Sequence, residues 1–313
     1  MVVYRGLDDR RLLRRPAAVA VGNFDGLHAG HQKILASLCR LARRRGLCSL
    51  VLTFEPHPER ALGKRSVRMI DTPEQRLARL RGTCVDAVAV IPFDRAFAGL
   101  GAAAFVNDVL RDALGAREVV VGRGFRFGHD RRGDIPLLRR LGRLSGVGVH
   151  AVDPAVRGGR TVSSTMVRGL LAHGRVEEAA RMLGRPYEIA GRVTTGKKRG
   201  RLLGYPTANL DTANEILPEG VYISETVRGG RTYASVTSIG TNPTFGPNPL
   251  SVETLLFDYR GSLYGASLNV RLLRRLRPPR AFRDADALAA GIRRDIERAR
   301  AWFARRGRGS ATA

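Results

Sequence analysis

Apolar and amphipathic stretches alternate through the first half of the chain. Short apolar runs are followed by stretches that carry apolar residues at every third or fourth position. The runs are AAVAVG (17–22), CSLVLTF (48–54), VDAVAVIPF (85–93) and EVVVG (118–122). Buried strands that alternate with amphipathic helices predict an α/β fold, in which helices cover both faces of a parallel sheet. Ligands of such sheets bind at the carboxyl ends of the strands.

The pattern changes in the second half. After one or two short helices predicted within 167–184, short β-type runs are separated by turns that contain Gly, Asn and Pro. The runs cover 187–193, 220–227, 232–240, 252–259 and 267–276. They predict a small antiparallel barrel, which a helix over 284–304 follows. We therefore expect domains at 1–183 and 184–305, and a flexible tail at 306–313.

Bulk composition is that of a globular protein. The chain is 43% hydrophobic and 26% charged, and its 313 residues suffice for two domains. No apolar run approaches the roughly 20 residues of a membrane helix, so we expect a cytoplasmic protein without a membrane partner. Cys39, Cys48 and Cys84 lack CxxC or metal-ligand spacing. We expect buried free thiols, with neither a disulfide framework nor a zinc site.

The net charge of +26 is large enough to concentrate polyanions. Four lysines and fifty arginines make up the basic residues, and the arginines are scattered along the whole chain. Arginine suits phosphate through its two-pronged donor geometry. No aromatic platform or DNA-reading pattern accompanies the charge, so we expect small anionic nucleotides as partners and no dedicated nucleic-acid binding. Homo-oligomerisation stays open.

The stretch AVGNFDGLHAGHQKIL combines a strand, a turn and the start of a helix. Helix amino termini present unpaired N–H groups and a positive dipole end, which favour a triphosphate. His28 and His31 would lie beside it, where imidazoles can donate hydrogen bonds to phosphate oxygens that gain charge in the transition state. The HxGH motif in this context predicts a nucleotide site. His129, His150 and His173 lie outside such motifs and are interpreted as structural.

GNFDGLHAGHQ resembles the opening motif of the adenylyltransferase module in bacterial bifunctional riboflavin kinase/FAD synthetases. TFEPHP (53–58), FRFGHDRRGD (125–134) and VSSTMVR (162–168) match further motifs of that family in order. The resemblance implies a Rossmann-like HxGH nucleotidyltransferase domain. It implies that FMN contacts Phe125 and Phe127, and that ATP phosphates contact Asn23, His28, His31, His57, Ser163, Ser164, Thr165 and Arg168. Without the resemblance, VSST is also an ordinary capping sequence and His57 a polar loop residue.

Two positions depart from the family pattern. Gly124 stands before FRFG where the family usually has Asn or Asp, and Met166 replaces an arginine of the common SSTRIR. Loss of a hydrogen-bonding partner costs roughly 1–3 kcal/mol. The departures predict slower adenylyl transfer or an altered nucleotide preference. They also motivate an alternative, a riboflavin kinase whose nucleotidyltransferase domain is impaired.

The second half contains no GxxxxGK[ST] loop. GRVTTGKKRGRLLGYPTANL instead supplies a basic, glycine-punctuated loop, followed by Thr207 and Asn209 at alternate strand positions. Their oxygens suit Mg²⁺. Taken alone, the stretch could be a basic surface loop beside a strand. It resembles the riboflavin-kinase signature, and LPEGVY, IGTNPTF and VETLLFDY follow in the family's order. The resemblance implies phosphate contacts at Gly196, Lys198 and Gly200, Mg-ATP organised by Thr207 and Asn209, and Glu253 as general base.

The predicted function is therefore bifunctional flavin-nucleotide synthesis. ATP phosphorylates riboflavin to FMN at an antiparallel β-barrel kinase domain with a C-terminal helix, and a second ATP converts FMN to FAD and pyrophosphate. Mg²⁺ offsets phosphate charge in both steps. A rival from another class is a basic protein that binds flavin or nucleic acid without turnover.

Overall fold

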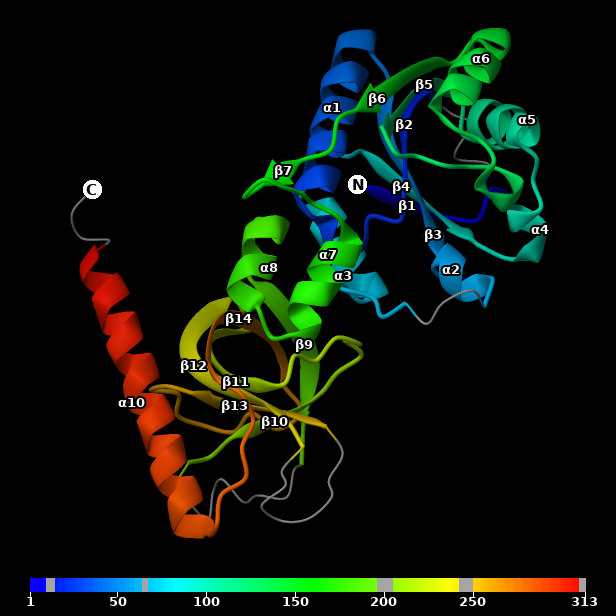
Figure 1. Ribbon diagram of the computed structural model, residues 1–313. Helices are drawn as coiled ribbons and strands as arrows, with labels where there is room; N and C mark the ends of the chain where they lie inside the picture. Colours follow the sequence, from blue (N-terminus) through cyan, green and yellow to red (C-terminus); the bar gives the residue numbers. More distant parts are fainter. Residues whose placement is uncertain (10–14, 64–66, 196–204, 242–249, 310–313) are drawn as a thin grey trace. The chain divides into compact units, whose positions relative to one another are not determined.

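The computed structural model describes residues 1–9, 15–63, 67–195, 205–241 and 250–309. The chain forms two compact units, Met1–Ser164 and Thr165–Ala313, which we call the N-terminal and C-terminal units (Figure 1). Helices α7 (Ser164–Ala172) and α8 (Val176–Leu183) thus belong mainly with the barrel by their contacts. The domain boundary at 183/184 stays a prediction about the two catalytic modules.

A six-stranded parallel sheet forms the centre of the N-terminal unit, as the alternating pattern predicts. Its strand order is β1-β4-β3-β2-β5-β6. The strands are β1 (Val2–Arg5), β2 (Ala17–Val21), β3 (Cys48–Glu55), β4 (Ala87–Pro92), β5 (Ala116–Gly122) and β6 (Gly148–Val152). Apart from the edge strand β1, the order starts at β2 in the centre. The strands β3 and β4 follow on one side of β2, and β5 and β6 follow on the other. The motif after β2 therefore lies where the strand order reverses, which is the usual ligand position of such sheets.

Helices cover both faces of this sheet (Figure 1). Ala18 and Ala20 of β2 belong to a buried cluster with α1 (Ala29–Arg45) and α3 (Pro73–Arg81). Val19 and Val21 point to the opposite face, where they join the cluster that contains residues of η3 (Phe105–Ala113) and α6 (Ile135–Ser145). The remaining elements are η2 (Asp25–Leu27), α2 (Pro58–Ala61), α4 (Arg95–Ala98), α5 (Ala102–Ala104), the π-helical η3 (Phe105–Ala113), η4 (His129–Arg131), α6 (Ile135–Ser145), β7 (Val156–Arg157) and β8 (Arg160–Thr161).

A closed antiparallel barrel forms the centre of the C-terminal unit and confirms the second predicted fold. Its strand order is β10-β13-β12-β11-β14-β9. The strands are β9 (Tyr187–Thr194), β10 (Ala208–Asp211), β11 (Gly220–Arg228), β12 (Arg231–Gly240), β13 (Ser251–Leu256) and β14 (Ser267–Arg277). The predicted final helix is α10 (Ala285–Gly309), which packs Ala299 against Ile223 and Phe257. It continues past residue 305, where we expected the tail to begin, and 310–313 lie outside the described residues.

Five buried hydroxyls form a continuous network inside the barrel. Ser224 and Thr226 of β11 bond to Ser235 and Thr237 of β12, and Thr254 of β13 completes the network. The oxygen–oxygen distances run from 2.7 Å for Ser224–Thr237 to 3.3 Å for Thr226–Thr254. All five side chains are fully buried. Because the hydroxyls satisfy one another, they avoid the cost that unpaired buried polar groups would carry.

The cysteine prediction is wrong for two of the three residues. Cys39 of α1 and Cys84, in the loop before β4, form a disulfide with a Cα–Cα distance of 6.2 Å. Their separation in sequence is 45 residues, so no short spacing motif indicates the pair. The fold creates this pair by packing α1 beside the loop that leads into β4. Cys48 is the remaining free cysteine, and burial raises the pKa of its thiol.

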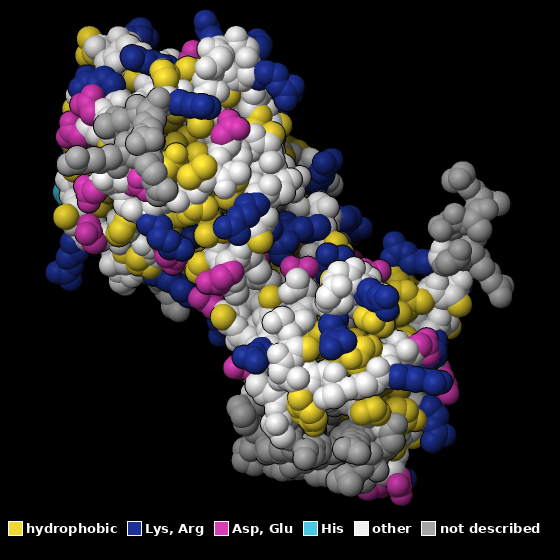
Figure 2. Space-filling model, turned by 180° about the vertical axis from the view of Figure 1, so that it is seen from behind, with side chains coloured by type: hydrophobic (Ala, Val, Ile, Leu, Met, Phe, Trp, Pro, Cys, Tyr) yellow, Lys and Arg dark blue, Asp and Glu magenta, His cyan; other side chains and the backbone are white. Residues whose placement is uncertain are grey.

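Charged side chains are dispersed over the surface. Figure 2 shows Lys and Arg spread over both units on the visible face, with apolar, acidic and other residues between them. In the part of the chain that the structure describes, no helix combines the length and the apolar character needed to cross a bilayer.

Candidate active sites

The HxGH motif of the N-terminal unit forms the start of α1. His28 is the N-cap residue, and its Nδ1 accepts hydrogen bonds from the backbone N–H of Gly30 at 3.1 Å and of His31 at 3.4 Å. Its side chain is buried, and its ring stacks on that of His31 with 3.7 Å between centroids. Because Nδ1 accepts, the neutral His28 ring carries its proton on Nε2. An imidazole of this tautomer can donate from Nε2 to a phosphate oxygen.

The His28 ring packs closely against Gly30. A Cβ atom at Gly30 would lie 3.0 Å from Cε1 and 3.1 Å from Nδ1 of His28. Such contacts are tighter than most Cβ contacts, so a side chain at position 30 would require the ring to shift by a few tenths of an ångström. The glycine of HxGH therefore has a packing reason that is independent of any ligand.

The turn between β2 and α1 holds an unusual backbone. Phe24 and Leu27 have φ values of 49° and 39°, in the left-handed region that side chains with a Cβ rarely adopt. The Asp25 carboxylate, buried at 1% exposure, accepts the N–H of Ile70 at 3.0 Å and of Asp71 at 3.2 Å. These bonds hold the turn against the segment before α3. Backbone strain of this kind concentrates at ligand sites.

Asn23 and His57 come from different strand ends and contact each other. Asn23 Nδ2 lies 2.9 Å from His57 Nε2, and the Glu59 N–H donates to His57 Nδ1 at 3.2 Å. The Asn23 amide and the His57 ring therefore fix each other's orientation. The strands thus bring together two residues that are 34 positions apart.

Arg76 fixes the backbone of this site from α3. Its guanidinium is 3% exposed, and Nη1 donates to the Asn23 carbonyl oxygen at 3.3 Å while Nη2 pairs with Glu55. The Thr53 hydroxyl donates to the same carbonyl at 3.1 Å. Sequence analysis missed Arg76 as a site residue. The sequence did contain a signal for it. Arg76 lies four residues before the buried Leu80, which places a cation on the buried face of an amphipathic helix.

The Phe125 and Phe127 rings lie parallel, with 5.7 Å between centroids. Phe127 is buried in the core cluster of the sheet, whereas Phe125 is half-buried against that cluster. Phe125 is thus the more accessible of the two for a flavin. Gly124 beside it is exposed, and a Cβ there would meet no atom within 4 Å.

In the C-terminal unit, three of the predicted kinase residues lie on one side of the barrel wall. Asn209 of β10 stands directly opposite Glu253 of β13, and the Thr207 hydroxyl donates to Glu253 Oε2 at 3.2 Å. Their neighbours Ala208 and Thr254 are buried on the inner side. The strand alternation therefore directs all three oxygen-bearing side chains outward, as the spacing of Thr207 and Asn209 predicts.

Two family models match the two units. The model for FAD synthetase matches residues 11–166, and the model for riboflavin kinase matches 183–303. A bifunctional riboflavin kinase/FMN adenylyltransferase of Pseudomonas fluorescens is 38% identical, covering 96% of this chain and 97% of its own. The Escherichia coli K12 protein of the same description is 37% identical, covering 91% and 92%.

The chain belongs to the bifunctional riboflavin kinase/FMN adenylyltransferase family. It combines riboflavin kinase and FMN adenylyltransferase in one polypeptide, and nothing in the fold or the comparisons favours a kinase-only protein. A solved structure from Streptococcus pneumoniae, named a macrolide-efflux protein, has a TM-score of 0.86 and 29% identity, covering 96% of this chain and 99% of its own.

The VSSTMVR segment contains further predicted residues of the bifunctional enzyme. Ser163 is half-buried ahead of α7, and the Ser164 hydroxyl donates to the Asp25 carbonyl oxygen at 3.0 Å, which ties the start of this segment to the HxGH turn. Thr165 and Arg168 belong to the C-terminal unit. Gly196, Lys198 and Gly200 lie outside the described residues.

Proposed function

We propose that Glu253 is the general base of the riboflavin kinase. A primary alcohol is a poor nucleophile until its proton is accepted as the bond to phosphorus forms. The Glu253 carboxylate is half-buried on the barrel wall, and Thr207 holds one of its oxygens at 3.2 Å while Ser251 lies 3.5 Å from the other. The contact between Thr207 and Glu253 carries the proposal. It orients the carboxylate beside the Thr207 hydroxyl and the Asn209 amide, both of which are suited to bind Mg-ATP.

Mg²⁺ is the metal that this donor set fits. Thr207, Asn209 and Glu253 offer hydroxyl, amide and carboxylate oxygens, the hard ligands that Mg²⁺ prefers. Among the described residues, no group of three His, Cys, Asp or Glu side chains is arranged as a metal site. A cation here would therefore rely on ATP phosphates and water for its other ligands. When bound, Mg²⁺ neutralises charge on the transferred phosphoryl group.

For adenylyl transfer we assign the phosphate contacts to the start of α1. His28 and His31 donate to oxygens of the ATP phosphates, and Asn23, which lies against His57, contacts the same ligand. Ser163 and Ser164 supply further donors, and Phe125 with Phe127 behind it contacts the isoalloxazine of FMN. The phosphate contacts of Thr165 and Arg168 stay a prediction from the family resemblance. The stacked histidine pair, of which His28 is buried, supports this assignment, because the two rings lie against each other at a helix amino terminus.

The remaining proposals concern where the enzyme acts and what it binds. We infer that it acts in the cytoplasm on small molecules, namely riboflavin, FMN and ATP, without dedicated binding of nucleic acid. The dispersion of its arginines supports this inference. Homo-oligomerisation is compatible with the described surface.

Steady-state kinetics of riboflavin phosphorylation test the role of Glu253. Glu253→Gln keeps the size and hydrogen-bonding capacity of the side chain but removes its basicity. We expect kcat to fall by about 10²- to 10⁴-fold with small changes in KM. Asp258→Asn is the matched control, since this carboxylate lies just beyond the same strand but is exposed and pairs with Arg300 at 3.1 Å.

The control should retain wild-type kcat. Both variants should convert supplied FMN to FAD at the wild-type rate, which shows that the N-terminal unit is intact. Near-normal phosphorylation by Glu253→Gln would rule out Glu253 as the base.

A further inference from the structure

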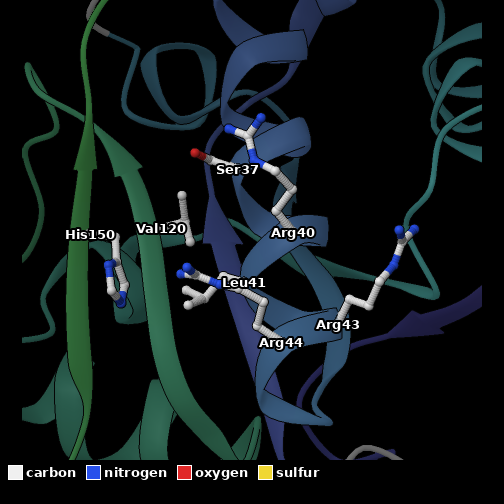
Figure 3. A pocket seen from close by; sticks show the side chains of 7 residues that line it. All are labelled: Ser37, Arg40, Leu41, Arg43, Arg44, Val120 and His150. Atoms are coloured by element: carbon white, nitrogen blue, oxygen red, sulfur yellow. The ribbon is translucent and has the colours of Figure 1, made fainter.

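A cavity of about 430 Å³ lies between α1 and the edge of the sheet (Figure 3). We call it the α1–β6 cavity. The residues that line it are Ser37, Arg40, Leu41, Arg43, Arg44, Val120 and His150. The first five belong to α1, while Val120 lies on β5 and His150 on the edge strand β6. This volume falls within the range of small-molecule sites.

The α1–β6 cavity is separate from the HxGH site. An α-helix rises about 1.5 Å per residue, so Arg40 and Arg44 lie roughly 14 and 20 Å along α1 from His31. A ligand in the cavity would therefore occupy the carboxyl-terminal half of α1, whereas the proposed ATP site occupies its amino terminus. The catalytic assignment leaves all seven lining residues unused.

The cavity is positively charged and contains no carboxylate in its lining. Arg40, Arg43 and Arg44 are exposed, and none of them forms an ion pair with another described residue. The nearby Glu118 is already engaged, because it lies 2.7 Å from His150 Nε2 and 3.5 Å from Arg45 Nε. Its side chain is 13% exposed. The negative charge of Glu118 is therefore offset locally and leaves the arginines available to an anion.

Figure 3 shows how the cations are arranged. The Arg44 guanidinium extends toward His150, and that of Arg40 lies on the side of Ser37, whereas Arg43 points away from them. Ser37, Arg40 and Arg44 follow one another at three- and four-residue spacing, which places them on one face of α1. Leu41 and Val120 are buried and form the floor of the cavity beneath the polar groups.

We propose that the α1–β6 cavity binds a phosphate-bearing small molecule of nucleotide size. Two guanidiniums on one helix face suit phosphate groups, since each presents a planar fork of donors. A nucleic acid would call for a longer basic track with aromatic stacking, and the seven lining residues include no such track.

Calorimetric titration of the full-length protein with ADP tests this proposal. ADP also enters the catalytic sites, so the decisive quantity is the number of equivalents bound. Wild-type protein should bind one equivalent more than the Arg40→Glu/Arg44→Glu variant. Arg139→Glu/Arg143→Glu on α6 is the matched control, because it changes two exposed arginines at the same spacing. It should bind as many equivalents as wild type.

Saturated rates of both reactions verify that each variant is folded, and we expect them to be unchanged. Equal ADP stoichiometry in wild type and the Arg40→Glu/Arg44→Glu variant would overturn the proposal. A single-stranded oligonucleotide serves as a second probe. Loss of oligonucleotide binding in the cavity variant, without loss of an ADP equivalent, would overturn the assignment to a small ligand.

Discussion

Individual residues of the HxGH motif have interlocking local roles. His28 caps α1 through Nδ1, which fixes its tautomer, and its ring leaves little space for a side chain at position 30. The same capping bonds that stabilise the helix leave Nε2 as the donor that we propose for phosphate. Under that proposal, capping and ligand binding depend on the same ring position, and a substitution at Gly30 should affect both.

Gly30→Ala is expected to impair adenylyl transfer and stability together. The new Cβ would shift the His28 ring by a few tenths of an ångström. Because a misplacement of about 1 Å can cost 10²-fold in rate, we expect the rate to fall several-fold. Weakening of the cap should lower the free energy of unfolding by up to about 1 kcal/mol. Assays of FMN adenylylation and denaturant unfolding measure these effects.

Gly169→Ala is the matched control for Gly30→Ala. Gly169 lies within α7, and a Cβ there would meet no atom within 4 Å. Alanine should raise helix stability by up to about 1 kcal/mol and leave the rate unchanged. A Gly30→Ala protein with normal rate and stability would show that the His28 ring tolerates displacement.

Gly124→Asn is expected to increase the efficiency of FMN adenylylation. The position is open and its backbone does not require glycine, so asparagine should fit without strain. A hydrogen bond to a charged ligand group is worth enough to raise kcat/KM about tenfold. Kinetics with varied ATP and varied FMN would show which substrate the amide contacts. Unchanged kcat/KM for both would mean that position 124 contacts neither.

At the scale of elements, the buried strands were predictable and the edge strands were not. β2, β3, β4 and β5 are continuous apolar runs because helices cover both of their faces. β1 and β6 were missed, since their burial is partial and their short sequences carry polar residues. The barrel strands were recognised from turns between β-type runs. The hydroxyl network inside the barrel escaped prediction, because isolated Ser and Thr positions do not indicate their partners.

The disulfide between α1 and the loop before β4 gives a prediction at the same scale. Thiol titration of the denatured, unreduced protein should detect one thiol per chain, Cys48, and three after reduction. Reduction should lower the free energy of unfolding by about 2–4 kcal/mol, because the bond closes a long loop. Three reactive thiols before reduction would contradict the pairing.

At the scale of the whole molecule, the two catalytic modules were predictable from motifs whose order matches the family. The sequence could not predict contacts made across the fold, such as Arg76 with the Asn23 carbonyl, Asp25 with the segment before α3, or Thr207 with Glu253. Each of these depends on elements far apart in the chain. The net charge agreed with anionic nucleotides in general but indicated no position for them, whereas the α1–β6 cavity brings three of the arginines to one place.

Product analysis of purified full-length protein with riboflavin and excess Mg-ATP tests the central claim most directly. We predict that FMN forms first and FAD follows, with one pyrophosphate released per FAD. His31→Ala should stop at FMN, and Glu253→Gln should form little of either product from riboflavin while still converting supplied FMN to FAD. Wild-type protein that accumulates FMN without FAD would contradict the bifunctional account.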